Sequence, residues 1–85
     1  MKTYLSKEDV EKILMGKKVR TKISIISWVS PVPIEVGKVG IIKRGLFKHK
    51  SFYAQAITTE AGKVYLTGDT PEEAIKELGN YLEHM

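Results

Sequence analysis

The chain has 85 residues, the size of one domain, and its 42% apolar and 28% charged residues are typical of a soluble globular protein. It contains no cysteine, which excludes a disulfide framework and thiolate chemistry. His49 and His84 are far apart and no calcium-loop pattern is present, so we expect no metal and no cofactor. No stretch approaches the roughly 20 apolar residues of a membrane span, and the first residues do not resemble a signal peptide. We therefore expect a cytoplasmic protein that does not associate with membranes.

The net charge of +4 is unevenly distributed along the chain. Residues 1–50 carry twelve Lys and Arg against four Asp and Glu, whereas residues 51–85 carry two against six. Such a distribution can direct a polyanion to one region of the surface and repel it from another. It is also compatible with solubility alone.

A short helix is predicted over residues 7–15. Ser6 is suited to cap its first turn, and Glu8 and Asp9 match the positive end of the helix dipole. Gly16 suits the left-handed conformation that closes a helix. The apolar stripe at helical spacing consists of Val10, Ile13 and Leu14.

Four strands are predicted next. In "KVRTKISIISWVS" β-branched residues alternate with polar ones, and this alternation places Ile26 and Trp28 on the polar face. "SPVP" ends the strand, because proline donates no hydrogen bond to a sheet. In "IEVGKVGIIKRG" the apolar positions change parity at Gly37, which predicts a bulge there. The third and fourth strands are "SFYAQAITTE" and "KVYLTG", joined by a hairpin in "EAGK".

The stretch "LTGDTPEEAIKEL" predicts the start of a second helix. Thr70 and Glu73 have the spacing of a capping box, and Pro71 occupies the first helical position. The carboxylates of Asp69, Glu72 and Glu73 would repel an anion, so helix initiation explains the junction better than a phosphate site does. The predicted buried stripe is Ala74, Ile75, Leu78, Tyr81 and Leu82.

These elements predict a single α+β domain over residues 1–85. Its order is helix, three or four antiparallel strands, helix, with both helices on one face of the sheet. The small side chains of Ala54 and Ala56 would let a helix approach the sheet closely. The other face would be left to water or to a partner.

Two basic runs, "GKKVRTK" and "KRGLFKHK", are candidates for contact with nucleic acid. Their cations could bind successive phosphates, while Phe47 stacks on a base or wedges between bases. Alternatively both runs are solvated, with Leu46 and Phe47 anchoring the second run to the core. The cations concerned are Lys17, Lys18, Arg20, Lys22, Lys43, Arg44, Lys48 and Lys50.

The strand alternation also predicts that aromatic side chains stand beside cations on the face of the sheet that the helices leave free. Tyrosine, tryptophan and arginine are enriched in interface hot spots, and they also stack on unpaired bases. The alternatives are a second small core under the basic loop, or a dimer contact. The residues predicted on this face are Trp28, Tyr53, Ile57 and Tyr65, beside Arg20 and Lys22.

Catalysis is not indicated. No serine, histidine and acid cluster is evident, and no carboxylate pair lies in an apolar setting. Gly37, Gly40 and Gly45 are spaced along a predicted strand and its exit, and do not form a glycine-rich nucleotide loop. We therefore expect a protein that is not an enzyme.

The segment "FYAQAITTEAGKVYLTGDTPEEAIKEL" resembles the last strands and helix of HicB-type antitoxins, and the resemblance extends over residues 52–82, about a third of the chain. In that family strands lead into a helix through a "GDT-x-EEA" signature. The resemblance implies an antitoxin-like role. The matching residues are Gly68, Asp69, Thr70, Glu72, Glu73 and Ala74.

The overall order of elements is similar to that of double-stranded-RNA-binding domains, which implies RNA binding. Members of that family contact phosphates with a lysine-rich start of the final helix. Here the corresponding segment is "TPEEAIKE", which is acidic. RNA would therefore be expected on another surface.

From these patterns we expect a small non-catalytic module that contacts nucleic acid, RNA or DNA, through a basic strand-and-loop surface. The alternative is a protein-binding regulator, antitoxin-like or an inhibitor, that acts on a protein partner. An exposed edge strand and an aromatic face would also permit a homodimer.

Overall fold

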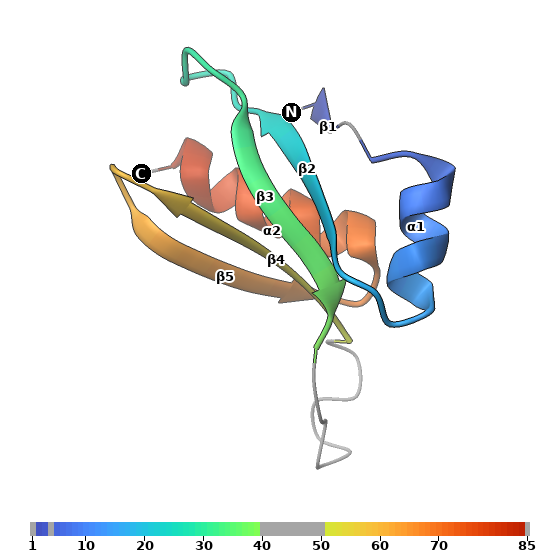
Figure 1. Cartoon of the computed structure of the whole chain (residues 1–85). Helices are drawn as coiled ribbons and strands as arrows, with labels where there is room; N and C mark the ends of the chain where they lie inside the picture. Colours follow the sequence, from blue (N-terminus) through green and yellow to red (C-terminus); the bar gives the residue numbers. More distant parts are fainter. Residues whose placement is uncertain (1, 4, 40–50, 85) are drawn as a thin grey trace.

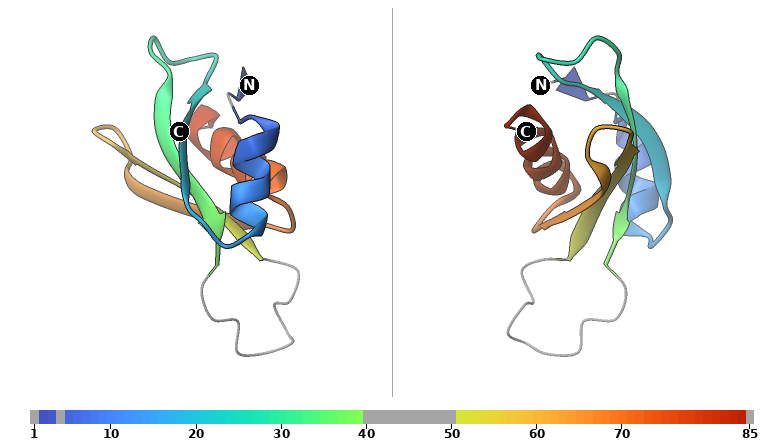
Figure 2. Two further views of the ribbon diagram at one scale, coloured as in Figure 1. Left: turned by 45° about the vertical axis from the view of Figure 1, so that its right-hand side comes forward. Right: turned by 90° about the vertical axis from the view of Figure 1, so that its left-hand side faces the viewer.

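A computed structural model describes residues 2–3, 5–39 and 51–84. They form an antiparallel sheet in the order β1-β2-β3-β4-β5, with both helices packed on the same face (Figures 1 and 2). The predicted α+β fold is confirmed, and β1 is a two-residue addition that the sequence did not indicate. The elements are β1 (Lys2–Thr3), α1 (Lys7–Leu14), β2 (Val19–Ser24), β3 (Val32–Lys38), β4 (Phe52–Thr58), β5 (Gly62–Gly68) and α2 (Pro71–Glu83).

Local capping explains where α1 begins and ends. The Ser6 hydroxyl accepts a hydrogen bond from the Asp9 amide at 3.1 Å, and the Asp9 carboxylate accepts one from the Ser6 amide at 3.3 Å. This reciprocal pair satisfies amides that have no partner inside the helix. Gly16 follows the last turn with φ of 94°, the left-handed conformation predicted for it.

The start of α2 is capped as predicted, with one shift. The Thr70 hydroxyl accepts from the Glu73 amide at 3.1 Å, but the Glu73 carboxylate accepts from Asp69, one residue earlier than a standard capping box. Gly68 is needed for another reason: a Cβ there would lie 2.5 Å from the backbone nitrogen of Ala74. The helix therefore starts in direct contact with the end of β5. Tyr81 was predicted in the buried stripe, and that is wrong, because its side chain is 51% exposed.

The pairing of β3 with β4 is regular, so the predicted bulge at Gly37 is wrong. Gly37 pairs with Tyr53 and Lys38 pairs with Phe52, in the same register as the rest of the strand. The change of parity has a simpler cause, since β3 ends at Lys38 and Val39 lies beyond it. A bulge is therefore not needed to accommodate the sequence.

The core fills the space between the sheet and the two helices. α2 packs on β4 and β5, and α1 packs on β2 and β3. Ala54 and Ala56 are fully or almost fully buried, so their small side chains let α2 approach the sheet as predicted. The core consists of Ile13, Val19, Ile23, Ile25, Val32, Ile34, Val36, Phe52, Ala54, Ala56, Val64, Ala74, Ile75, Leu78 and Leu82.

The predicted position of Trp28 on the free face of the sheet is wrong. β2 ends at Ser24, and the chain then turns, with the Trp28 amide donating to the Ile25 carbonyl at 2.9 Å. Side chains alternate between the two faces only within a strand, so the alternation of β2 does not place residues beyond this turn. The indole instead packs against the edge of the core, on the side of the sheet that carries α2.

Candidate functional site on the outer face of the sheet

The face of the sheet opposite the helices, called here the outer face, is built from cross-strand rows of side chains. One row runs from Arg20 on β2 through Glu35 on β3 and Gln55 on β4 to Tyr65 on β5. Pairing of Ile57 with Lys63 and of Gly37 with Tyr53 adds neighbouring rows. The outer face comprises Arg20, Lys22, Pro33, Glu35, Gly37, Tyr53, Gln55, Ile57, Lys63, Tyr65 and Thr67.

Tyr53 lies in the row of this face where β3 ends and β4 begins, and it is held from three sides. Its ring lies over Gly37, where a Cβ would come within 3.0 Å of the ring. Its hydroxyl donates a hydrogen bond of 2.6 Å to the Glu35 carboxylate. Its ring also stacks on that of Tyr65, with centroids 5.0 Å apart and planes 14° from parallel. As a result only 6% of Tyr53 is exposed, although it belongs to the outer face.

The surroundings of Tyr53 favour its neutral form. Burial, and then the hydrogen bond to Glu35, raise the pKa of the Tyr53 hydroxyl well above its ordinary value. The phenol therefore stays a hydrogen-bond donor to the carboxylate throughout the physiological range. This hydrogen bond joins Glu35 to Tyr53 on the same face of the sheet.

Tyr65 is the aromatic side chain that the outer face offers to solvent. It is 45% exposed, and Tyr53 supports its ring by parallel stacking. Arg20, Lys22 and Lys63 are exposed on the same face, and Ile57 is 71% exposed beside Lys63. The outer face thus combines a supported aromatic ring on β5 with exposed cations on β5 and β2.

The opposite side of the molecule is acidic. α2 and the turn before it carry five carboxylates and a single lysine, and this helix lies on the other side of the sheet (Figure 2). The cations of the outer face and these carboxylates therefore lie on opposite sides of the sheet. The residues are Asp69, Glu72, Glu73, Glu77 and Glu83, with Lys76.

The structure gathers part of the predicted site. Arg20, Lys22, Tyr53 and Tyr65 all belong to the outer face, although Tyr53 is buried there and does not present a free ring surface. Lys17 and Lys18 are exposed and lead directly into β2. Trp28 lies elsewhere, as described above. The remaining predicted residues, Lys43, Arg44, Phe47, Lys48 and Lys50, lie outside the described part of the chain.

Two charged residues of the outer face were missed from the sequence. Lys63 alternates with Tyr65 in "KVYLTG", so the alternation that located Tyr65 also locates Lys63. Glu35 lies between the buried residues Ile34 and Val36, and the same rule applies to it. Their roles depend on cross-strand neighbours, which a single sequence does not reveal.

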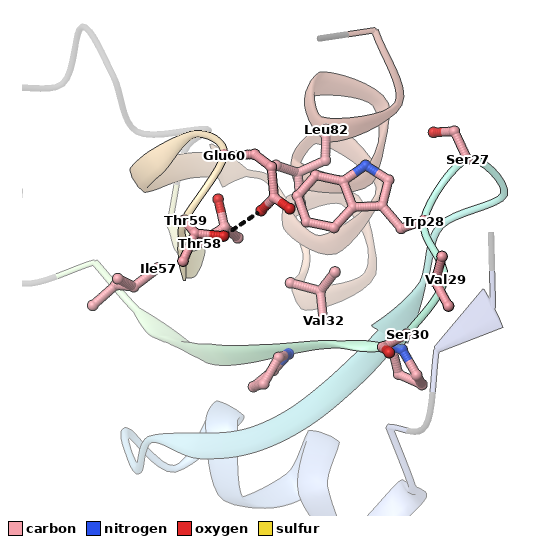
Figure 3. A pocket seen from close by; sticks show the side chains of 12 residues that line it. Ser27, Trp28, Val29, Ser30, Val32, Ile57, Thr58, Thr59, Glu60 and Leu82 are labelled. Atoms are coloured by element: carbon pink, nitrogen blue, oxygen red, sulfur yellow. Dashed lines mark hydrogen bonds between the residues drawn. The ribbon is translucent and has the colours of Figure 1, made fainter.

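A second feature is a groove of about 700 Å³ between the β2–β3 connection and the β4–β5 hairpin, lined by both apolar and polar side chains. In Figure 3 the Trp28 ring lies beside Leu82 of α2, and the Glu60 side chain is close to it. Glu60 is the one charged residue of the lining, and it accepts a hydrogen bond from the Thr59 hydroxyl at 3.0 Å. Near the groove Ile26 is 86% exposed and Val29 is fully exposed.

Within residues 2–3, 5–39 and 51–84 no group of three or more histidine, aspartate or glutamate side chains is placed to hold a metal ion. In the same part of the chain no helix has the length and apolar character to cross a membrane. Comparisons with models of protein families, with curated proteins and with solved structures gave no match to this chain.

Proposed function

We propose that this protein is a small non-catalytic module that binds single-stranded nucleic acid on the outer face of its sheet. The observation that carries the proposal is the exposed, stacked ring of Tyr65 on a face that also exposes Lys63 on the same strand and Arg20 and Lys22 on β2. Bases stack on aromatic side chains only when they are unpaired, and cations beside such a ring can contact the phosphates between bases.

The distribution of charge supports an approach from this side. The acidic surface of α2 lies behind the sheet and repels a polyanion, whereas the outer face attracts one. Lys17, Lys18 and Lys38 are exposed at the end of the sheet where β2 begins and β3 ends, and they extend the cationic surface. A single-stranded nucleic acid bound across the outer face would meet positive charge on β2, on β5 and at this end of the sheet.

The test is a triple variant, Arg20→Gln/Lys22→Gln/Lys63→Gln, measured for binding to a single-stranded RNA oligonucleotide over a series of salt concentrations. If the three cations contact phosphates, the slope of log K against log salt should fall in magnitude by about 2, since each contact to a single strand contributes about 0.7. The affinity at low salt should fall with it.

The matched control replaces three exposed lysines of the helices, Lys7, Lys12 and Lys76, by glutamine. This variant has the same net charge as the first but retains the outer face. It should bind RNA with a nearly unchanged salt slope. Equal losses in the two variants would show that only net charge matters, and absence of binding by the unmodified protein would reject the proposal.

A second candidate function, a regulator that binds a protein partner, is favoured by the groove beside Trp28. The lining combines apolar residues with serines, threonines and one carboxylate, that of Glu60, and exposed apolar residues lie in and near the groove. This chemistry fits an apolar segment of a partner that carries a lysine or arginine. Trp28→Ala should then abolish a salt-insensitive protein complex and leave RNA binding intact, and the reverse result would remove this candidate.

A further inference from the structure

The outer edge of β5 has no neighbouring strand in the described part of the chain. β5 is seven residues long, contains no proline, and carries one charged residue, Lys63. The opposite edge of the sheet is the two-residue β1 (Figure 1). Proteins usually shorten, charge or bend exposed edges, because unpaired backbone groups recruit other strands. β1 follows that rule by its length, whereas the full-length strand β5 follows it only through the single charge of Lys63.

We propose that β5 pairs in antiparallel fashion with β5 of a second copy of this chain, around a twofold axis at Tyr65. Tyr65 is the central residue of Gly62–Gly68, so this register aligns all seven residues of both strands. Lys63 then lies opposite the partner's Thr67, and Val64 lies opposite the partner's Leu66. Such an interface uses the same surface on both copies, as twofold dimers do.

The side chains of β5 are complementary to themselves in this register. Lys63 faces a threonine and not a second lysine, so no like charges are opposed. On the helix side, buried Val64 meets half-buried Leu66, which continues the apolar core across the axis. On the outer face the two Tyr65 rings lie opposite each other, and aromatic cross-strand pairs stabilise sheets.

The pairing also accounts for Tyr81, an aromatic residue of α2 that is 51% exposed. α2 packs mainly on β5 and β4, so the two copies of α2 run side by side across the dimer axis. Tyr81 and Glu83 lie on opposite flanks of the buried stripe of α2. Glu83 is half-buried, so its flank faces the rest of the domain. Tyr81 therefore lies on the flank that faces the second copy.

The dimer deepens the proposed function, because it joins two outer faces into one continuous cationic surface with Tyr65 at its centre. Its test does not rest on that function, since assembly is measured without nucleic acid. A monomer that binds RNA would support the proposed function and reject the dimer. A dimer that does not bind RNA would support the dimer and reject the proposed function.

The experiment compares Thr67→Lys with Thr67→Glu by sedimentation equilibrium at low salt. Lysine at position 67 faces the partner's Lys63 twice in the dimer, so the dimer dissociation constant should rise about tenfold. Glutamate at the same position forms two opposite-charge pairs and should not weaken the dimer. Thr67 pairs with Tyr53 of β4, and because the two variants have side chains of similar size, any disturbance of that pair is shared between them. The double variant Lys63→Glu/Thr67→Lys should restore assembly.

Hydrogen exchange supplies the second readout. The amides of β5 should become more protected as protein concentration rises, and those of β2 should not. The proposal is overturned if the unmodified chain sediments as the 9.6 kDa monomer at every concentration. It is overturned as well if the Lys and Glu variants assemble equally, or if the concentration-dependent protection lies outside β5.

Discussion

Tyr53 shapes the outer face of the sheet although its own side chain is buried. Its ring covers Gly37, its hydroxyl binds Glu35, and its face supports Tyr65. Each contact crosses from one strand to the next, so Tyr53 links β3, β4 and β5 on the outer face. A residue that was predicted to stack on a ligand is therefore better described as the support for the residue that can.

This arrangement makes stability depend on pH in a defined direction. The pKa of Tyr53 is raised above its ordinary value of 10.0 by burial first and the Glu35 hydrogen bond second. The stabilisation is fully present below the unfolded-state pKa and is lost as pH rises toward the folded-state pKa. The free energy of unfolding should thus fall between about pH 9 and pH 11, and less steeply in Tyr53→Phe.

Urea unfolding of both proteins across that range provides the measurement. At neutral pH Tyr53→Phe should be less stable by about 1 kcal/mol, because the hydrogen bond to Glu35 is lost while the ring contacts remain. All other titratable groups are the same in the two proteins, so their contributions cancel in the comparison. Parallel pH profiles for the two proteins would contradict the role assigned to the Tyr53 hydroxyl.

Among the elements, the junction of β5 with α2 shows the tightest packing requirement. A methyl group at Gly68 would lie 2.5 Å from the Ala74 nitrogen and 2.8 Å from the Glu73 carbonyl carbon, both of which are backbone atoms that cannot swing away. Gly68→Ala should therefore displace the first turn of α2 and cost about 1–3 kcal/mol. Amides of that turn should exchange faster with solvent.

Gly62→Ala is the matched control for Gly68→Ala. Gly62 has a positive φ of 70° and open space where a Cβ would point. Its replacement should cost about 1 kcal/mol through backbone strain, and it should not change exchange in α2. If the two variants had the same effect on α2, the close contact at Gly68 would not explain the junction.

An element could be predicted from the sequence when the residues that determine it are close together in the chain. The caps at Ser6 and Thr70, and the alternation in β2, β4 and β5, involve residues a few positions apart, and these predictions are confirmed. The end of β2 was misplaced, because the turn after Ser24 interrupts an apolar pattern that continues through Ile26 and Trp28. The burial of Tyr53 was also missed, since it depends on neighbours that pair across strands.

At the scale of the whole molecule, the described residues place exposed cations on one side of the sheet and the carboxylates of α2 on the other. The outer face carries Arg20, Lys22 and Lys63 against Glu35, and the helix side carries the carboxylates of α2. The fold thus provides an orientation for a charged partner as well as a surface. The proposed β5 dimer keeps this separation, because both outer faces lie on the same side of the joined sheet.

The central claim is that nucleic acid approaches the outer face and not the helices. It is tested most directly by amide chemical shifts recorded while a single-stranded RNA oligonucleotide is added to the isotope-labelled protein. We expect the largest changes among described residues at Arg20, Gln55 and Tyr65, with small changes along α1 and α2. Changes concentrated on α2 or around Trp28, or no changes at all, would contradict the account.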